Sequence, residues 1–224
     1  MANLPNRLIS LKLPALPLAP TEYARQYHDQ VNNIHRIYYT QVNNITGSLL
    51  TNTGGRFLGF PHGSFYDTTT QSDGVDTPNA VQLNSTTLVD TFGISVENDE
   101  NNNPVRVTAE FPGIYNIQFS LQLENQDNAQ HDAYIWLRHN GTDVINTATS
   151  VTVPARKSAG VYGYAVAAWN FFQEMQGGDY FELMWATNTT LISMPYLGAQ
   201  TSPYPRPAIP SVILTVSFVS AIPA

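Results

Sequence analysis

The sequence Tyr115-Asn-Ile-Gln-Phe-Ser-Leu-Gln-Leu123 alternates apolar and polar residues from its first position to its last. Successive side chains of a β-strand point to opposite faces, so this alternation predicts a strand with one buried face and one polar face. Related apolar segments occur at residues 133–139, which an Asn-Gly hairpin signal follows, and at 180–186 and 212–219. Shorter candidate strands lie at residues 65–70, 79–83, 94–97 and 105–108. Together they predict a mainly β fold, an antiparallel jelly-roll sandwich that forms a head domain over residues 63–224.

The segment 161–172 is apolar on both faces of a predicted strand. In an antiparallel sandwich only one face of a strand meets the core of its own domain, so the second face needs another partner. We expect this partner to be another subunit. The residues predicted for the subunit interface of the head are Tyr162, Tyr164, Val166 and Phe172. The last strand, 212–219, is also apolar on both faces, which predicts a central position in its sheet.

An internal repeat precedes the predicted strands. YHDQVNN at residues 27–33 and YYTQVNN at 38–44 agree at five of seven positions and are eleven residues apart. Eleven residues make about three helical turns, so the apolar residues of a helix with this repeat return to one side. The resulting stripe consists of Tyr23, Tyr27, Val31, Ile34, Tyr38, Val42 and Ile45.

Such a narrow stripe on a helix rich in Asn and Gln is too small for an isolated helix to be stable. The pattern favours a short parallel coiled coil of identical chains, and the alternative is an amphipathic helix packed on its own domain. We therefore predict one long coiled-coil-type helix, a trimerising stalk over residues 21–47. Thr21 is suited to cap its start and Gly47 to end it. A Gly-rich neck over residues 48–62 follows.

Residues 1–20 contain prolines at positions 5, 14, 17 and 20, which exclude a regular helix and favour an extended arm. The arm is apolar, so we expect it to dock along another protein; the alternative is an arm that folds back on its own domain. The predicted docking residues are Leu8, Leu11, Leu13, Leu16 and Leu18.

Residues 195–210 are interrupted by several prolines and predict an irregular surface loop. Tyr196, Tyr204 and Arg206 make this loop the candidate surface for recognising a protein or a glycan, because exposed aromatic rings and guanidinium groups dominate such contacts. The alternative is a loop that covers an edge of the sandwich.

Composition excludes several classes of function. The net charge is −7 and no cluster of Lys or Arg occurs, which argues against a nucleic-acid partner. The chain has no cysteine, so it has neither disulfides nor thiolate sites. The prolines interrupt any signal peptide at the N-terminus, and no apolar run is long enough for membrane insertion.

No motif for catalysis stands out. Ser64 near His62 lacks the nucleophile elbow of a hydrolase, and no Gly-rich phosphate loop follows a strand. His28 and His35 are seven residues apart, close to one face of the predicted helix, but solvated histidines are the commoner outcome. We expect no catalytic residue, no cofactor and no metal site.

Four segments, in this order, resemble the jelly roll of complement globular heads and tumour-necrosis-factor-like proteins. They are FPGIYNIQFSLQ (111–122), AYIWLRHNGTDV (133–144), GGDYFELMW (177–185) and SVILTVSFV (211–219). The resemblance covers roughly residues 63–221 and implies a compact homotrimer preceded by a stalk. The chain departs from that family because it has neither a collagen stalk nor a signal peptide.

The arm, the repeat and GGRFLGFPHGSFYDTTTQ (54–71) resemble uncharacterised virion proteins of tailed bacteriophages, in particular cyanobacterial and marine phages. This resemblance implies a virion protein made in the host cytoplasm, whose arm contacts other virion proteins. We expect a non-enzymatic homotrimeric short fibre, spike or tail-associated protein whose head contacts a glycan or protein of the host surface, or other virion proteins. The alternatives are a capsid decoration protein and a polysaccharide-degrading tail enzyme.

Overall fold

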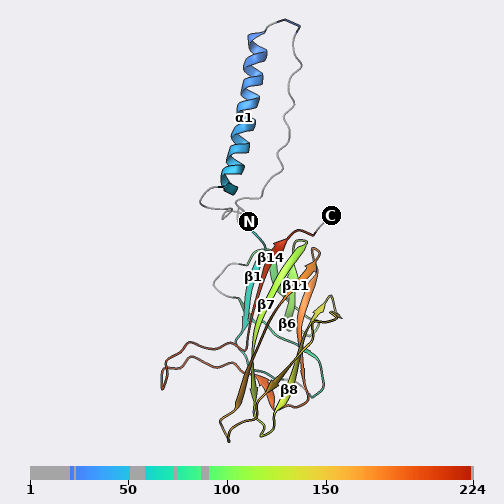
Figure 1. The fold of residues 1–224 in the computed structure, drawn as a ribbon, viewed down its shortest axis with the longest axis vertical. Coiled ribbons are helices and arrows are strands. Elements are labelled where there is room, and N and C mark those ends of the chain that lie inside the picture. Colours follow the sequence, from blue (N-terminus) through green and yellow to red (C-terminus); the bar gives the residue numbers. More distant parts are fainter. Residues whose placement is uncertain (1–20, 23, 51–58, 73–74, 87–90, 223–224) are drawn as a thin grey trace. The chain divides into compact units, whose positions relative to one another are not determined.

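The structure is a computed structural model that describes residues 21–22, 24–50, 59–72, 75–86 and 91–222. The chain divides into two compact units, Met1–Gly59 and Phe60–Ala224. The first unit contains the helix α1 (Arg25–Leu50), and the second contains the β-strands, as the colours along the sequence show in Figure 1.

Helix α1 differs from the predicted stalk at both ends. The carbonyl oxygen of Ala24 accepts hydrogen bonds from the backbone N–H groups of Tyr27 and His28 at 3.1 and 3.3 Å, so Ala24 caps the helix in place of Thr21. The helix also continues through Gly47 to Leu50. Glycine inside a helix costs about 1 kcal/mol relative to alanine, which weakens a helix without ending it.

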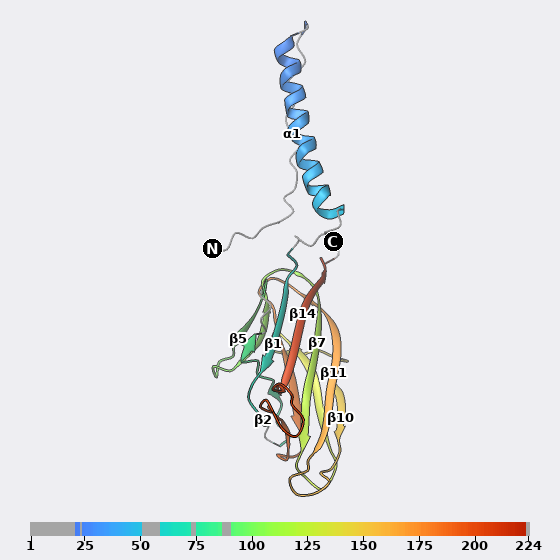
Figure 2. The same ribbon diagram turned by 90° about the vertical axis from the view of Figure 1, so that its left-hand side faces the viewer.

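Sheet A lies on one side of the sandwich, and all its strand pairs are antiparallel. β7 is its central strand: Phe119 pairs with Leu214 of β14 on one side and with Trp169 of β11 on the other. β1 pairs with the far side of β14, and Figure 2 shows β1, β14, β7 and β11 side by side in this order. The strands of sheet A are β1 (His62–Asp67), β2 (Gln71–Ser72), β4 (Ser85–Thr86), β7 (Gly113–Asn125), β11 (Gly163–Met175), β13 (Ile192–Met194) and β14 (Val212–Ser220).

Sheet B forms the second layer, with the order β10-β8-β12-β6-β5. β8 and β12 pair from Phe181 opposite His139 to Thr187 opposite Ala133. The strands of sheet B are β3 (Asn79–Ala80), β5 (Ile94–Asn98), β6 (Pro104–Ala109), β8 (His131–His139), β9 (Thr142–Asp143), β10 (Thr149–Val153) and β12 (Tyr180–Thr187).

The connections between the strands determine which kind of β-sandwich the head forms. The chain crosses from one sheet to the other between β6 and β7, β7 and β8, β10 and β11, and β11 and β12. The main strands are ordered β1-β14-β7-β11 in sheet A and β6-β12-β8-β10 in sheet B. Two interleaved Greek keys of this kind form a jelly roll. The predicted mainly β, antiparallel sandwich is confirmed, and the central position of the last strand, β14, is also confirmed.

The core lies between the two sheets. In β7 the apolar residues from Tyr115 to Leu123 are buried at every second position, as their alternation predicts. Trp185, Phe181 and Phe65 are the largest buried side chains from the other strands, each 1% exposed. The phenol of Tyr115 donates a hydrogen bond to the carbonyl oxygen of Phe111 at 2.6 Å, which satisfies the polar atom of a buried ring.

The head begins at Phe60, before the predicted boundary at Gly63. The ring of Phe60 stacks on that of Phe218, with 6.0 Å between ring centroids and 6° between ring planes. The backbone N–H of Phe218 donates to the carbonyl oxygen of Pro61 at 2.9 Å. Of the predicted neck, residues 48–50 therefore belong to α1 and residues 60–62 to the head, and 51–58 lie outside the described residues.

Candidate functional site

The outer face of sheet A is the surface that points away from the core, and neutral residues cover its centre. One row of neighbours across the sheet is Tyr66, Ile213, Ser120 and Ala168, and the next is Ser64, Thr215, Gln118 and Asn170. The carboxylates of β7 and β11 lie near strand ends, at Glu124, which is 6% exposed, and at Glu174.

An exposed apolar patch lies at one side of this face, on β11. Tyr164, Val166 and Phe172 are 53%, 59% and 65% exposed. The alternate residues Ala165, Trp169 and Phe171 point inward and pack against the core. β11 therefore has the two apolar faces that the sequence predicts, and the role of the outward face as a subunit interface stays a prediction. Tyr162 lies just before β11 and is half-buried.

β11 is also an edge strand. It pairs with β7 along its whole length, from Gly163 opposite Asn125 to Met175 opposite Gly113, and no second strand of the described chain pairs with it. An unpaired edge leaves backbone donors and acceptors open to another chain, and many proteins protect such an edge with proline or lysine. β11 contains neither, and Glu174 is its one charged residue.

Charged side chains gather on the other side of the sandwich. Every basic partner of an acid–base contact in the described head lies on β6 or β8 of sheet B: Arg106 and Arg138 point outward, and the two histidines lie at the ends of β8. The closest contacts join Arg106 to Glu100 at 2.6 Å, His131 to Asp127 at 2.7 Å, and Arg138 to Asp143 at 2.8 Å. The pairs of Arg106 and Arg138 thus place ionic groups on the outer face of sheet B, whereas the centre of the outer face of sheet A has none.

The one phenol of the β11 patch, that of Tyr164, is neutral at pH 7, because the ordinary pKa of a tyrosine is about 10. Tyr164 lies directly opposite Glu124 of β7. Burial of the phenol, together with a hydrogen bond to Glu124 and the negative charge of that carboxylate, raises the pKa of Tyr164 above its ordinary value. Since Val166 and Phe172 do not ionise, the patch carries no charge of its own at neutral pH.

The 195–210 segment is a projecting loop without a helix or strand, and two isolated backbone bridges hold its two sides together. Leu197 and Ile209 exchange two backbone hydrogen bonds, of 3.0 and 2.8 Å, and Gln200 and Arg206 exchange two of 2.9 Å. These pairs make a narrow antiparallel ribbon, which extends away from the sandwich in Figure 1. The segment contains no helix or strand, as predicted, but two isolated backbone bridges hold it as a ribbon, which the sequence did not predict.

The three predicted recognition residues lie apart on this ribbon. Tyr204 is 79% exposed and lies between the paired residues Gln200 and Arg206. Arg206 is turned inward, since its Nη1 donates to the carbonyl oxygens of Gly198 and Pro207 at 2.9 and 3.1 Å. Tyr196 is half-buried at the base of the ribbon. The structure does not bring the three side chains together, and Arg206 holds the loop.

A shallow apolar hollow of about 390 Å³ lies at the base of the ribbon. It opens on the outer face of sheet A, because Tyr66 and Ile213 point to that face from β1 and β14. The residues that line it are Tyr66, Thr68, Tyr196, Ala208, Pro210 and Ile213. Sequence analysis missed Tyr66 and Ile213, although each is an apolar residue at an outward position of a strand.

On helix α1, six residues of the predicted stripe are half-buried: Tyr27, Val31, Ile34, Tyr38, Val42 and Ile45. No side chain of residues 24–46 is buried. Ile37 and Tyr39, beside the stripe, are 48% and 66% exposed. Tyr23 and the leucines of the arm, Leu8, Leu11, Leu13, Leu16 and Leu18, lie outside the described residues.

Neither a metal-binding cluster nor a membrane-spanning helix occurs among the described residues. No group of three or more His, Asp or Glu side chains that could hold a metal ion occurs among them. No helix there has both the length and the apolar character needed to cross a bilayer. Comparison of the chain with protein-family models and with curated proteins finds no match.

Proposed function

We propose that this protein is a non-enzymatic structural virion protein of a tailed phage, and that it works as a homotrimer. In this proposal it is a short fibre, a spike or a tail-associated protein. The arm and the helical stalk attach it to the particle, and the jelly-roll head faces the host surface or neighbouring virion proteins.

The observation that carries the homotrimer is the outer face of sheet A. It combines an uncharged centre, the unpaired edge of β11 and the exposed side chains of Val166 and Phe172, whereas the ionic groups lie on sheet B. Surfaces that become buried between subunits are poor in charge and rich in aromatic residues. A second copy of this chain is the occupant that we infer for this face.

The arrangement of the face favours a ring. The β11 patch and the hollow at Tyr66 and Ile213 are two different surfaces on the same face, separated by the polar centre around Gln118 and Ser120. If the patch of one copy enters the hollow of the next, the contact is heterologous, and a heterologous contact that closes makes a cyclic oligomer. Three copies agree with the homotrimer implied by the family resemblance.

The helix supports the same assembly. Its stripe repeats every eleven residues, which matches the period of a straight or slightly right-handed bundle. The side chains of the stripe are half-buried in the single chain, so further apolar surface is available for burial against two other copies.

Two measurements test the homotrimer and its position on the virion. Light scattering on the purified chain should give about three times its mass of 24.7 kDa, and a mass near 24.7 kDa would overturn the homotrimer. Labelled antibody against the head should mark the tail or its fibres on intact particles. Label spread over the capsid surface would instead identify a decoration protein.

Two further experiments test the roles of the arm and of the head. Deletion of residues 1–20 should leave the mass of the oligomer unchanged and reduce its incorporation into particles; normal incorporation would mean that the arm is not the anchor. Incubation with host polysaccharide should release no reducing ends. Release that depends on this protein would contradict the non-enzymatic assignment.

A further inference from the structure

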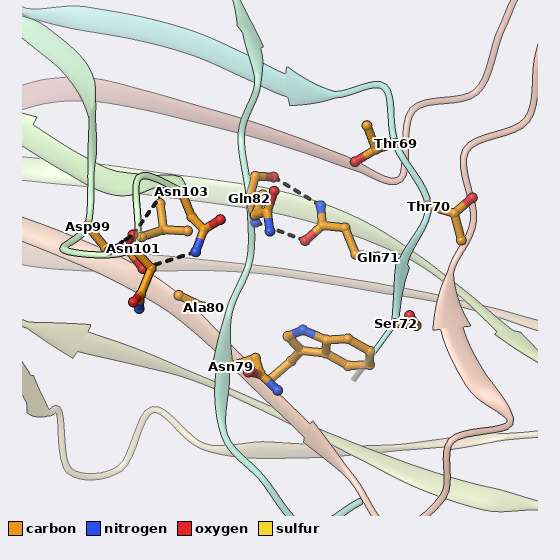
Figure 3. Close-up of a pocket in the computed structure, with 12 residues that line it drawn as sticks. Thr69, Thr70, Gln71, Ser72, Asn79, Ala80, Gln82, Asp99, Asn101 and Asn103 are labelled. Carbon is orange, nitrogen blue, oxygen red and sulfur yellow. Dashed lines mark hydrogen bonds between the residues drawn. The ribbon is translucent and has the colours of Figure 1, made fainter. Parts of the chain in front are cut away.

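A polar hollow of about 360 Å³ lies in the head, away from the outer face of sheet A. Three short segments build it: residues 69–72 form one side, residues 99–103 the other, and residues 79–82 run between them, as Figure 3 shows. Val105 and Trp185 complete the lining. Its volume lies at the lower end of the range for small-ligand sites, roughly 300 to 1,000 Å³.

The Gln71 side chain fixes two of these segments to each other. Its Nε2 donates to the carbonyl oxygen of Gln82 at 3.0 Å, and its Oε1 accepts from the backbone N–H of Gln82 at 2.9 Å. The amide thus takes the place of a paired strand, and Gln71 is only 8% exposed. This clamp holds the backbone of Gln82 in place and leaves the Gln82 side chain available.

The Asp99 carboxylate fixes the opposite wall. Its Oδ1 accepts hydrogen bonds from the backbone N–H groups of Asn101 and Asn103 at 2.9 and 2.8 Å, and its Oδ2 accepts from Nδ2 of Asn103 at 3.3 Å. The backbone N–H of Asn103 is the largest cause that lowers the pKa of Asp99. The Asp99 carboxylate therefore holds the loop in its conformation, and the hydrogen-bond donors of the loop stabilise the negative charge of Asp99.

Several polar groups of the lining have no partner in the described part of the chain. The Ser72 hydroxyl, the Gln82 side-chain amide and the Trp185 indole N–H make no hydrogen bond there. Trp185 is 1% exposed, so its N–H is an indole donor held in place by the core. An amide offers both donors and an acceptor, a hydroxyl can do either, and indole only donates.

The chemistry of the lining selects the class of ligand. Among the described residues no Lys, Arg or His lines the hollow, so the described lining has no group to balance the charge of a phosphate or a carboxylate. Asp99, the one acid among the described lining residues, is engaged by the loop, which disfavours a cation, because cation sites need several free oxygen ligands. Amides, hydroxyls and an indole N–H instead match a neutral ligand rich in hydroxyl groups. We propose that this hollow binds a neutral sugar residue of a glycan.

This inference extends the proposed function, since a head that faces the host surface would use such a site to hold a surface glycan. It moves the recognition site from Tyr196, Tyr204 and Arg206 to the hollow around Gln82. The two proposals fail separately, because sugar binding is measured on the purified chain whatever its mass. A homotrimer that binds no sugar contradicts only the sugar site, and a monomer that binds sugar contradicts only the homotrimer.

The test uses saturation-transfer NMR on the full chain with methyl glycosides of glucose, galactose, mannose and N-acetylglucosamine at millimolar concentration. At least one should bind, and glucuronate and glucose 6-phosphate should bind at least about tenfold more weakly. Gln82→Ala and Ser72→Ala should each weaken binding about five- to tenfold, the effect of one lost hydrogen bond. Gln176→Ala is the matched control, since Gln176 lies in the exposed turn between β11 and β12.

Thermal unfolding of each variant accompanies the binding measurement. The side chains of Gln82 and Ser72 make no hydrogen bond to the described part of the chain, so both variants should unfold at the wild-type temperature. The proposal is overturned if none of the four glycosides binds, if binding survives both substitutions unchanged, or if the charged sugars bind as tightly as the neutral ones. Calcium that raises the unfolding temperature in the absence of sugar would also overturn it, in favour of a cation site.

Discussion

Phe172 of β11 lies directly opposite Asn116 of β7 on the outer face of sheet A. The Phe172 ring is 65% exposed, and the side-chain oxygen of Asn116 is buried without a hydrogen-bond donor among the described residues. The exposed ring gains from a covering surface that supplies apolar contact. A neighbouring subunit would provide such a surface.

The first prediction follows from this pair. Phe172→Asp should leave the head folded, because the ring contributes little to the core, and should convert the proposed homotrimer into a chain with the monomer mass of 24.7 kDa. Burying a charge in an interface costs several kcal/mol, more than most single contacts supply. Light scattering measures the mass. Tyr204→Asp, at a position 79% exposed on the projecting loop, is the control and should keep the trimer mass.

The second prediction concerns the helix. Ile34 belongs to the half-buried stripe, whereas Ile37 lies beside it and is 48% exposed. Ile34→Asp should raise the concentration at which the oligomer dissociates at least about tenfold, since burial of an isoleucine contributes roughly 1.5 to 3 kcal/mol. Dilution series followed by light scattering give this concentration. An equal or larger effect of Ile37→Asp would mean that the stripe is not the contact face.

Much of the fold can be predicted from the sequence because period-two patterns report which strands have a buried face. Tyr115 to Leu123 alternate in the sequence and are buried at alternate positions in β7. A pattern of side chains does not predict a segment that only backbone hydrogen bonds hold together. The 195–210 ribbon depends on backbone pairs such as Leu197 with Ile209. Its prolines interrupt any side-chain pattern, so the sequence does not predict this pairing.

Of the candidate sites, too, one can be predicted from the sequence and one cannot. The two-faced character of β11 can be predicted, because an apolar run on both faces of a strand is visible in the sequence. The sugar hollow cannot, since it depends on a clamp between Gln71 and Gln82 and on a loop arranged by Asp99. Polar residues at these positions look like ordinary turns until the register of the sheets brings the segments together.

The third prediction tests how much the buried carboxylate of Asp67, close in sequence to the polar hollow, stabilises the head. Asp67 is 0% exposed and accepts hydrogen bonds from Thr69, from the backbone N–H of Asn84 and from the Ser211 hydroxyl. Asp67→Asn replaces an acceptor by an NH₂ group that faces donors, so it should lower the free energy of unfolding by about 2 to 3 kcal/mol. Urea denaturation measures the loss. Asp29→Asn, on the exposed surface of α1, should change stability by less than about 0.5 kcal/mol.

Glu182 of β12 gives the basis for a prediction about pH. Its carboxylate is 7% exposed and points to the outer face of sheet B, opposite Arg138, with its Oε1 3.7 Å from Nε of Arg106. Burial raises the pKa of Glu182, and the charges of Arg106 and Arg138 oppose this shift without cancelling it. The folded protein therefore binds this proton more tightly than the unfolded chain does.

The fourth prediction is the pH dependence that follows. Because the folded-state pKa of Glu182 is raised, its ionisation destabilises the head as the pH rises from the unfolded pKa of about 4.3 through the folded value. Glu182→Gln resembles the protonated form, so it should unfold at a higher temperature than the wild type at pH 7, and the difference should vanish below about pH 4. Calorimetry over this range measures it, with the exposed Glu110→Gln as control. A variant less stable than the wild type at pH 7 would mean that the attraction of the two arginines outweighs the cost of burial.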